Sequence, residues 1–148
     1  MGAVAFDCYA DGRDIEEAFR NARDGALWEY GHGRYTGSVA EKFGYMTVVI
    51  PERTTVQDIM KRIPGARVAL GDHDREFSTK QDHGDLEWLI KRFGKARAHR
   101  LVNNYEDKWG PAIAFELRGN ERKQAREYLG VPKGSPRKVY RFVGTAPC

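Results

Sequence analysis

Apolar and polar residues alternate at the start of the chain, which predicts a strand. In residues 3–9, Val4, Phe6 and Cys8 fall on one side and polar or small residues fall on the other. A half-buried strand produces this period of two. Further strands are predicted over residues 45–50, 67–70, 113–118 and 137–143. The run 45–50 is apolar on both sides, so we expect it to be a central strand.

Apolar residues at helical spacing lie between these strands. Ile15, Phe19 and Ala22 follow Asp14, whose carboxylate suits the first turn of a helix, and Gly31 suits its end. This pattern predicts a helix over 13–30. Other helices are predicted from Thr54 to Pro64, over 85–93 with a continuation or second helix through 101–105, and over 120–130. Residues 71–84 have no periodicity and predict a loop that could act as a lid.

The order of these elements indicates an α+β fold. Helices separate the strands too irregularly for a doubly wound parallel sheet. We therefore predict a two-layer sandwich, with a mixed sheet of four to five strands and helices mainly on one face. The length of 148 residues suits a single domain, residues 1–148, that buries a core without disulfides or metals.

Charge is divided unevenly along the chain. Residues 1–60 hold 6 Lys+Arg and 10 Asp+Glu, a net of −4, whereas residues 61–148 hold 19 and 11, a net of +8. The densest basic run is predicted to lie on a helix and contains Lys91, Arg92, Lys95, Arg97 and Arg100. A second run contains Lys133, Arg137, Lys138 and Arg141. Clustered cations attract nucleic acid, although a solvated helix face has the same composition.

The glycine-rich segment 31–42 is the strongest candidate for a ligand site. Its glycines would let backbone N–H groups approach a ligand, and its cations and hydroxyls are donors for phosphate or carboxylate oxygens. The predicted ligand-binding residues are Gly33, Arg34, Tyr35, Thr36, Gly37, Ser38 and Lys42. The segment follows a predicted helix and leads into a strand, the reverse of the order in phosphate-binding glycine motifs. The alternative is that its glycines only shape turns.

Two sets of residues are candidates for chemistry. His32 and Glu41 could act as acid and base, because imidazole titrates near neutral pH and burial raises a carboxyl toward it. Weaker candidates for a divalent metal are Asp72, His73, Asp74, Asp82 and His83. None of these residues stands in a standard metalloenzyme motif, and polar turns have the same composition. The sequence leaves open whether the protein uses a cofactor.

The remaining features concern the compartment. Cys8 and Cys148 lie far apart and form no CxxC pair, so a disulfide framework is not expected. No segment approaches the ~18 apolar residues of a membrane span, and the N-terminus does not resemble a signal peptide. We expect a soluble cytoplasmic protein that does not bind membranes. Its oligomeric state is left open.

One segment carries a resemblance. The residues from Trp28 to His32, followed by Tyr35-Thr36-Gly37-Ser38-Val39-Ala40-Glu41-Lys42, come after a helix that contains Ala and Phe. This run resembles small proteins of actinobacteria and their phages that carry a Tyr-Thr-Gly-x-x-Ala-Glu-Lys segment and have no assigned activity. The resemblance covers roughly the first third of the chain. It implies an intracellular bacterial setting or a phage-encoded accessory protein, and it carries over no catalytic role to any residue.

These observations leave three hypotheses about function. The first is binding of an anionic ligand, a nucleotide or nucleic acid, through residues 31–42 and the basic helix. The second is a small hydrolase or nuclease that acts on a phosphorylated substrate. The third is an interaction module that inhibits a host protein through an exposed helix or sheet edge.

Overall fold

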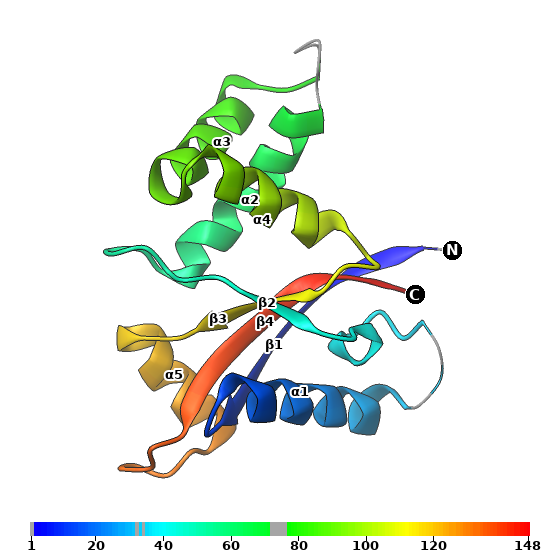
Figure 1. Ribbon diagram of the computed structural model, residues 1–148, viewed down its shortest axis with the longest axis vertical. Helices are drawn as coiled ribbons and strands as arrows, with labels where there is room; N and C mark the ends of the chain where they lie inside the picture. The colour runs from blue at the N-terminus through cyan, green and yellow to red at the C-terminus, as the bar shows by residue number, and fades with distance from the viewer. Residues whose placement is uncertain (1, 32, 34, 72–76) are drawn as a thin grey trace. The chain divides into compact units, whose positions relative to one another are not determined.

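The computed structural model describes residues 2–31, 33, 35–71 and 77–148 of the chain. It confirms the predicted α+β class with a mixed sheet of four strands (Figure 1). The chain divides into two compact units, which are described separately. Unit 1 comprises residues 1–49 and 104–148, and unit 2 comprises residues 50–103.

Unit 1 contains the sheet. Its strands are β1 (Ala3–Gly12), β2 (Tyr45–Thr47), β3 (Ala112–Glu116) and β4 (Lys138–Pro147). The strands lie in the order β1-β4-β3-β2, so the first and last strands of the chain are neighbours. β4 pairs antiparallel with both β1 and β3, whereas β2 pairs parallel with β3. β1 is therefore one edge of the sheet.

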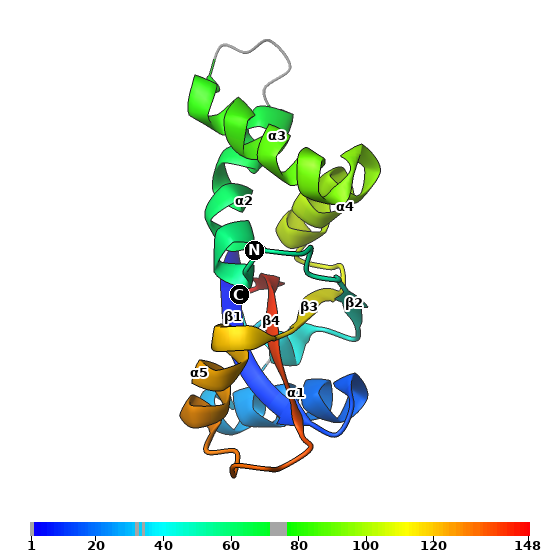
Figure 2. The same cartoon turned by 90° about the vertical axis from the view of Figure 1, so that its left-hand side faces the viewer.

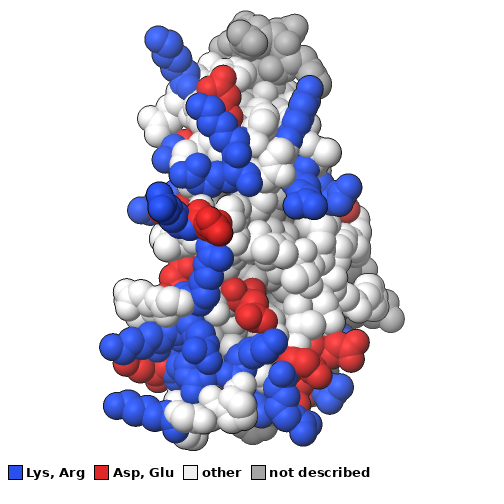
Figure 3. Space-filling model, turned by 60° about the vertical axis from the view of Figure 1, so that its left-hand side comes forward, with Lys and Arg blue, Asp and Glu red and all other residues white. Residues whose placement is uncertain are grey.

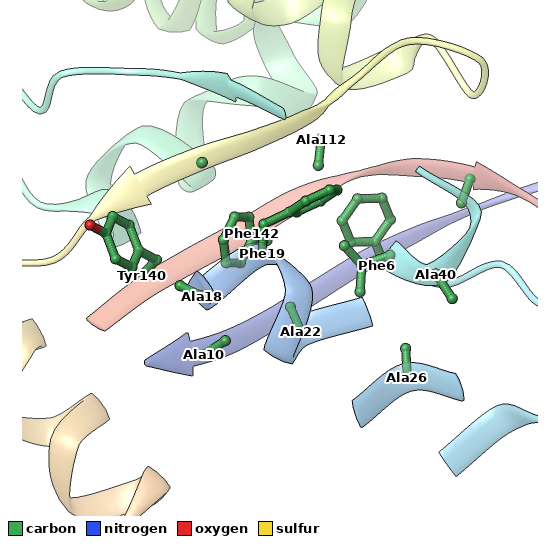
Figure 4. Close-up of a cluster of buried hydrophobic side chains, with 13 residues drawn as sticks. Phe6, Ala10, Ala18, Phe19, Ala22, Ala26, Ala40, Ala112, Tyr140 and Phe142 are labelled. Carbon is green, nitrogen blue, oxygen red and sulfur yellow. The ribbon is translucent and has the colours of Figure 1, made fainter. Parts of the chain in front are cut away.

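Helix α1 (Ile15–Tyr30) covers one face of this sheet. Its first turn begins as predicted, because the Asp14 side chain accepts a hydrogen bond from the Glu17 N–H. Phe19 of α1 packs on Phe142 of β4 and Tyr45 of β2, with ring centroids 5.6 and 5.2 Å apart. Figure 4 shows Phe19 and Phe142 among the alanines of α1 and β3. The small alanines let the helix approach the sheet closely.

Helix α5 (Gly119–Leu129) lies at the opposite face, beside β1 and β4. Successive side chains of a strand point to opposite faces. Phe6 of β1 belongs to the core under α1, whereas the Tyr9 ring meets Tyr128 of α5 with centroids 6.0 Å apart. Figures 1 and 2 show α1 and α5 on different sides of the β1 strand. The edge of β1 thus lies between two helices.

Unit 2 is helical. It contains α2 (Val56–Gly71), α3 (Lys80–Phe93) and most of α4 (Lys95–Glu106). Its buried apolar residues include Ile59, Ile63, Leu89 and Val102. Gly65 lets α3 approach α2, because a Cβ at this position would overlap the Asp85 carboxylate. Asp85 is buried, and it accepts from Arg62 at 3.0 Å.

Several predicted boundaries were wrong. The predicted strand 67–70 belongs to α2, which continues through Pro64 although proline cannot donate the helical N–H hydrogen bond. The predicted loop 71–84 is shorter, since Thr79 begins α3 with a capping box that the apolar pattern does not reveal. Residues 45–50 contain only the short edge strand β2 instead of a central strand.

Candidate functional site

The glycine-rich segment bonds mainly to the protein itself. Thr36 donates from both its N–H and its hydroxyl to the Glu41 carboxylate, each at 3.1 Å. The buried Ser38 caps the 3₁₀ helix η1 (Val39–Glu41) by accepting from Ala40 N–H. The Gly37 N–H donates to the Pro147 carbonyl at 2.9 Å. These N–H groups are therefore already engaged and do not point toward an external anion.

Lys42 is buried beneath the segment. The residue is 1% exposed, and Nζ donates to the carbonyls of Asp107, Lys108 and Gly110 at 3.2, 3.2 and 2.8 Å. Nζ also lies 5.8 Å from the centre of the Phe6 ring. Burial lowers the pKa of Lys42, and the charge of Asp107 acts in the opposite direction. This contradicts the expectation that the ammonium group faces outward.

The other predicted ligand-binding residues do not form a cluster in the described structure. Tyr35 adopts a positive φ of 60° and its ring meets the edge of Trp109, with centroids 6.3 Å apart. A Cβ at Gly33 would meet no atom within 4 Å. Arg34 lies outside the described residues. The described part of the Tyr-Thr-Gly-x-x-Ala-Glu-Lys segment therefore connects β4 with the 107–110 turn through hydrogen bonds.

The predicted catalytic pair cannot be assembled from described residues alone. Glu41 bonds to Thr36, while His32 lies outside the described residues. The free thiol of Cys8 is no substitute, because burial, followed by the charge of Asp7, raises its pKa to about 12. A thiol with this pKa stays protonated at neutral pH and is a poor nucleophile.

The predicted metal ligands are partly described. Asp72, His73 and Asp74 lie outside the described residues. Asp82 accepts from the Thr79 N–H at 2.9 Å in the capping box of α3, and His83 shares a 2.7 Å hydrogen bond with Ser78. Within the described ranges, no group of three or more His, Cys, Asp and Glu side chains could hold a metal ion.

The predicted basic cluster lies at the corner between α3 and α4. All five side chains are exposed: Lys91, Arg92, Lys95, Arg97 and Arg100. Gly94, with φ of 85°, makes the turn between the helices. Arg92 lies over the Trp88 ring, with its Cζ 4.2 Å from the ring centre. Among the described residues, none of the five cations forms an ion pair. We call these five residues the α3–α4 cluster.

The second basic run differs because most of its cations are used inside unit 1. Arg137 binds Asp11 at 2.5 Å and Glu17 at 2.8 Å, and Arg141 binds Asp7 at 2.5 Å. These partners raise the pKa of both guanidinium groups. On the face that Figure 3 shows, carboxylates lie beside many of the cations. Of the two basic runs, only the α3–α4 cluster consists of cations without carboxylate partners in the described structure.

The chain matches no protein-family model, no curated protein and no solved structure at a significant level. Among the described residues, no helix is both long enough and apolar enough to cross a membrane. The geometry of the chain itself therefore carries the functional argument.

Proposed function

We propose that this protein binds nucleic acid through the α3–α4 cluster. The single observation that carries the proposal is the position of Lys95 and Arg97 in the first turn of α4, which has no acidic residue. The N-terminus of a helix is the positive end of its dipole, so each cation there is destabilising by about 0.3–1 kcal/mol. Stability of the fold gives no reason for this arrangement.

The surrounding residues strengthen the positive potential at this corner. Lys91 and Arg92 end α3 and lie next to the start of α4 along the chain. Arg100 lies on the same helix, three residues after Arg97 and so next to it on the helix surface. Like charges at this spacing repel one another unless a polyanion neutralises them. A phosphate backbone supplies that neutralisation at several points at once.

The proposal predicts how strongly binding depends on salt. If all five cations contact phosphates, the slope of log Kobs against log [salt] is about −3.5 for a single strand and about −4.5 for duplex DNA. Phosphate contacts by cations carry no sequence information, so we expect similar affinity for unrelated sequences. A nucleotide with one or two phosphates would contact fewer cations and bind more weakly.

Fluorescence anisotropy with labelled single-stranded RNA and duplex DNA tests the proposal across a potassium chloride series. The variant Lys95→Gln/Arg97→Gln/Arg100→Gln should bind at least about tenfold more weakly at low salt, with the slope reduced by about 2 to 3. The matched control, Arg122→Gln/Lys123→Gln/Lys133→Gln, removes three exposed cations elsewhere. This control should bind nearly as well as the unmodified protein.

Two results would contradict the proposal. One is the absence of binding to either nucleic acid at low salt. The other is an equal loss of affinity in the two triple variants, because binding would then reflect net charge and not the α3–α4 cluster.

A further inference from the structure

The outer edge of β1 has hydrogen-bonding groups without a strand partner. In the β1–β4 register Ala3 lies opposite Pro147, so Gly2 lies opposite Cys148. Gly2 and Cys148 form a hydrogen-bonded pair, because the Cys148 N–H donates to the Gly2 carbonyl at 3.3 Å. Antiparallel pairs alternate between those that exchange hydrogen bonds and those that do not. Even-numbered residues of β1 therefore bond to β4, and odd-numbered residues point their N–H and C=O groups away from it.

Asp11 confirms this alternation. Its carbonyl points away from β4, since it accepts from Asn21 Nδ2 of α1 at 2.9 Å. Ala5, Asp7 and Tyr9 have the same orientation. Within the part of the chain that the structure describes, no residue bonds to their outward N–H and C=O groups. Their backbone presents an unpaired edge about 17 Å long, at about 3.4 Å per residue.

A groove with a volume of about 800 Å³ runs along this edge. Its floor includes Ala5, Asp7 and Tyr9 of β1. One wall is formed by α1, including Gly25 and Glu29, and the other contains Tyr128 and Leu129 of α5. The volume falls in the range of ligand-binding pockets. An exposed strand edge is normally blocked by a charge, a bulge or a covering element, and here the floor of the groove stays open.

The walls determine which kind of strand fits. A second folded copy would present a β1 edge flanked by the same two helices, and these would meet the walls before the strands came within about 4.8 Å. A single extended segment carries no such walls. It could pair with β1 along the groove and place alternate side chains toward α1 and toward α5.

Gly25 makes space on the α1 side. Glycine inside a helix is less favourable than alanine by about 1 kcal/mol. A Cβ at Gly25 would meet no atom within 4 Å, so packing inside the protein does not require glycine there. The missing side chain leaves room for a large apolar side chain of the segment that binds. Tyr9, Tyr30 and Tyr128, which also line the groove, are typical of protein interfaces.

The charge of the groove selects the segment. The chain carries a net charge of +4, yet none of the described residues that line this groove is Lys or Arg. Among the described lining residues, the carboxylates are Asp7, which is paired with Arg141, and Glu29, which forms no ion pair with another described residue. Glu29 therefore attracts a cation, whereas an acidic segment would find no partner.

We propose that the groove beside β1 binds an extended, basic segment of another protein as an added fifth strand. The outward N–H and C=O groups of Ala5, Asp7 and Tyr9 pair with the segment backbone. Gly25 accommodates one apolar side chain, and Glu29 binds a Lys or Arg side chain. This site is independent of the nucleic-acid site proposed for the α3–α4 cluster.

A yeast-displayed library of random heptapeptides tests this proposal against the full chain. Enriched peptides should combine alternate apolar residues with Lys or Arg and should be poor in Asp and Glu. Gly25→Leu fills the groove and should weaken their binding by at least about tenfold. The matched control is Gly84→Leu in α3, where a Cβ also meets no atom within 4 Å. This control should bind the peptides as the unmodified protein does.

Hydrogen exchange identifies the mode of binding. On addition of the most enriched peptide, the N–H groups of Ala5, Asp7 and Tyr9 should exchange at least about tenfold more slowly, whereas those of Phe6 and Cys8 should change little because they already bond to β4. N-methylation of the peptide amides that face β1 should abolish binding, and N-methylation of the intervening amides should not.

Five outcomes would overturn the proposal. The library could yield no binder, or yield acidic peptides. The enriched peptides could bind Gly25→Leu as well as they bind Gly84→Leu. Exchange could slow at residues other than the β1 edge. Finally, sedimentation could show self-association that Gly25→Leu abolishes, which would make a second copy the occupant.

Discussion

Replacing Lys42 with methionine removes a buried ammonium group and keeps most of the apolar side chain. Three carbonyls, at Asp107, Lys108 and Gly110, lose their donor. Hydrogen bonds to charged groups contribute about 1.5–3 kcal/mol each, and the lower value suits a turn that water partly reaches, which gives about 4.5 kcal/mol in total. Methionine avoids the cost of burying a charge, so the loss is smaller than this sum, and removing one partner of a buried charged interaction typically costs about 3–5 kcal/mol. We expect a net loss of about 3 kcal/mol.

Urea unfolding followed by circular dichroism measures this loss. With an m-value of about 2 kcal/mol/M, the midpoint should fall by about 1.5 M. Lys138→Met is the matched control, because Lys138 is half exposed and pairs with Glu116 only at 3.4 Å. An exposed pair contributes about 0–1 kcal/mol, so the control should shift the midpoint far less.

The pH dependence provides a second measurement on the same variant. In the folded protein, burial lowers the pKa of Lys42 below its ordinary value of 10.5. Between that lowered pKa and 10.5 the unfolded chain binds more protons, so the contribution of Lys42 to stability rises with pH. The difference between the unmodified protein and Lys42→Met should therefore grow as the pH approaches 10.5. Equal urea midpoints for Lys42→Met and Lys138→Met would refute the conclusion that buried Lys42 stabilises the fold through these hydrogen bonds.

Three further predictions concern single residues. Gly37→Ala should destabilise the protein by about 2–3 kcal/mol in urea unfolding, because φ is 71° and the new Cβ overlaps a side chain of β1; Gly119→Ala, with φ of 57° and open space, should cost only about 1 kcal/mol. A thiol reagent at neutral pH should label the exposed Cys148 in the native protein much faster than the half-buried Cys8, because the raised pKa of Cys8 keeps its thiol protonated, and equal native labelling rates would contradict this. Hydrogen bonds from Arg13 and Arg137 lower the pKa of Glu17 below its ordinary value of 4.5. The contribution of Glu17 to stability is therefore complete above pH 4.5 and is lost as the pH falls through the lowered pKa. Glu17→Gln should flatten this part of the curve of stability against pH, and an unchanged curve would be evidence against the ion pair.

Sequence signals predicted a helix or strand best where the residues that give the signal lie within a few residues of one another. Asp14 and Gly31 bracket α1, and the alternation through Phe6 and Cys8 indicates β1. The same reasoning failed at Pro64, because a proline inside a helix removes one hydrogen bond and can kink the helix without ending it. Thr79 was missed because its capping box precedes the apolar stripe of α3.

The candidate sites show the same difference: a site formed by residues close along the chain was easier to predict than one that depends on distant residues. The α3–α4 cluster is contiguous in the chain, and its cations are exposed on neighbouring helices as the charge pattern suggested. The ligand-binding interpretation of residues 31–42 depended on which way the donors point. Charge and glycine content do not determine that direction, because a lysine has the same local pattern whether its ammonium meets water or carbonyls of the chain.

By itself, the amino-acid sequence determined the class of the fold, the main helices and strands, and the uneven distribution of charge, because these depend on side-chain periodicity and on groups close along the chain. Only the tertiary structure decided that β1 forms an edge beside β4 and that Lys42 bonds to carbonyls 65 to 68 residues away. Such pairings join distant segments, and their stability comes from burial and exclusion of water, which exist only after the chain has folded. The open groove beside β1 is a product of the same long-range assembly.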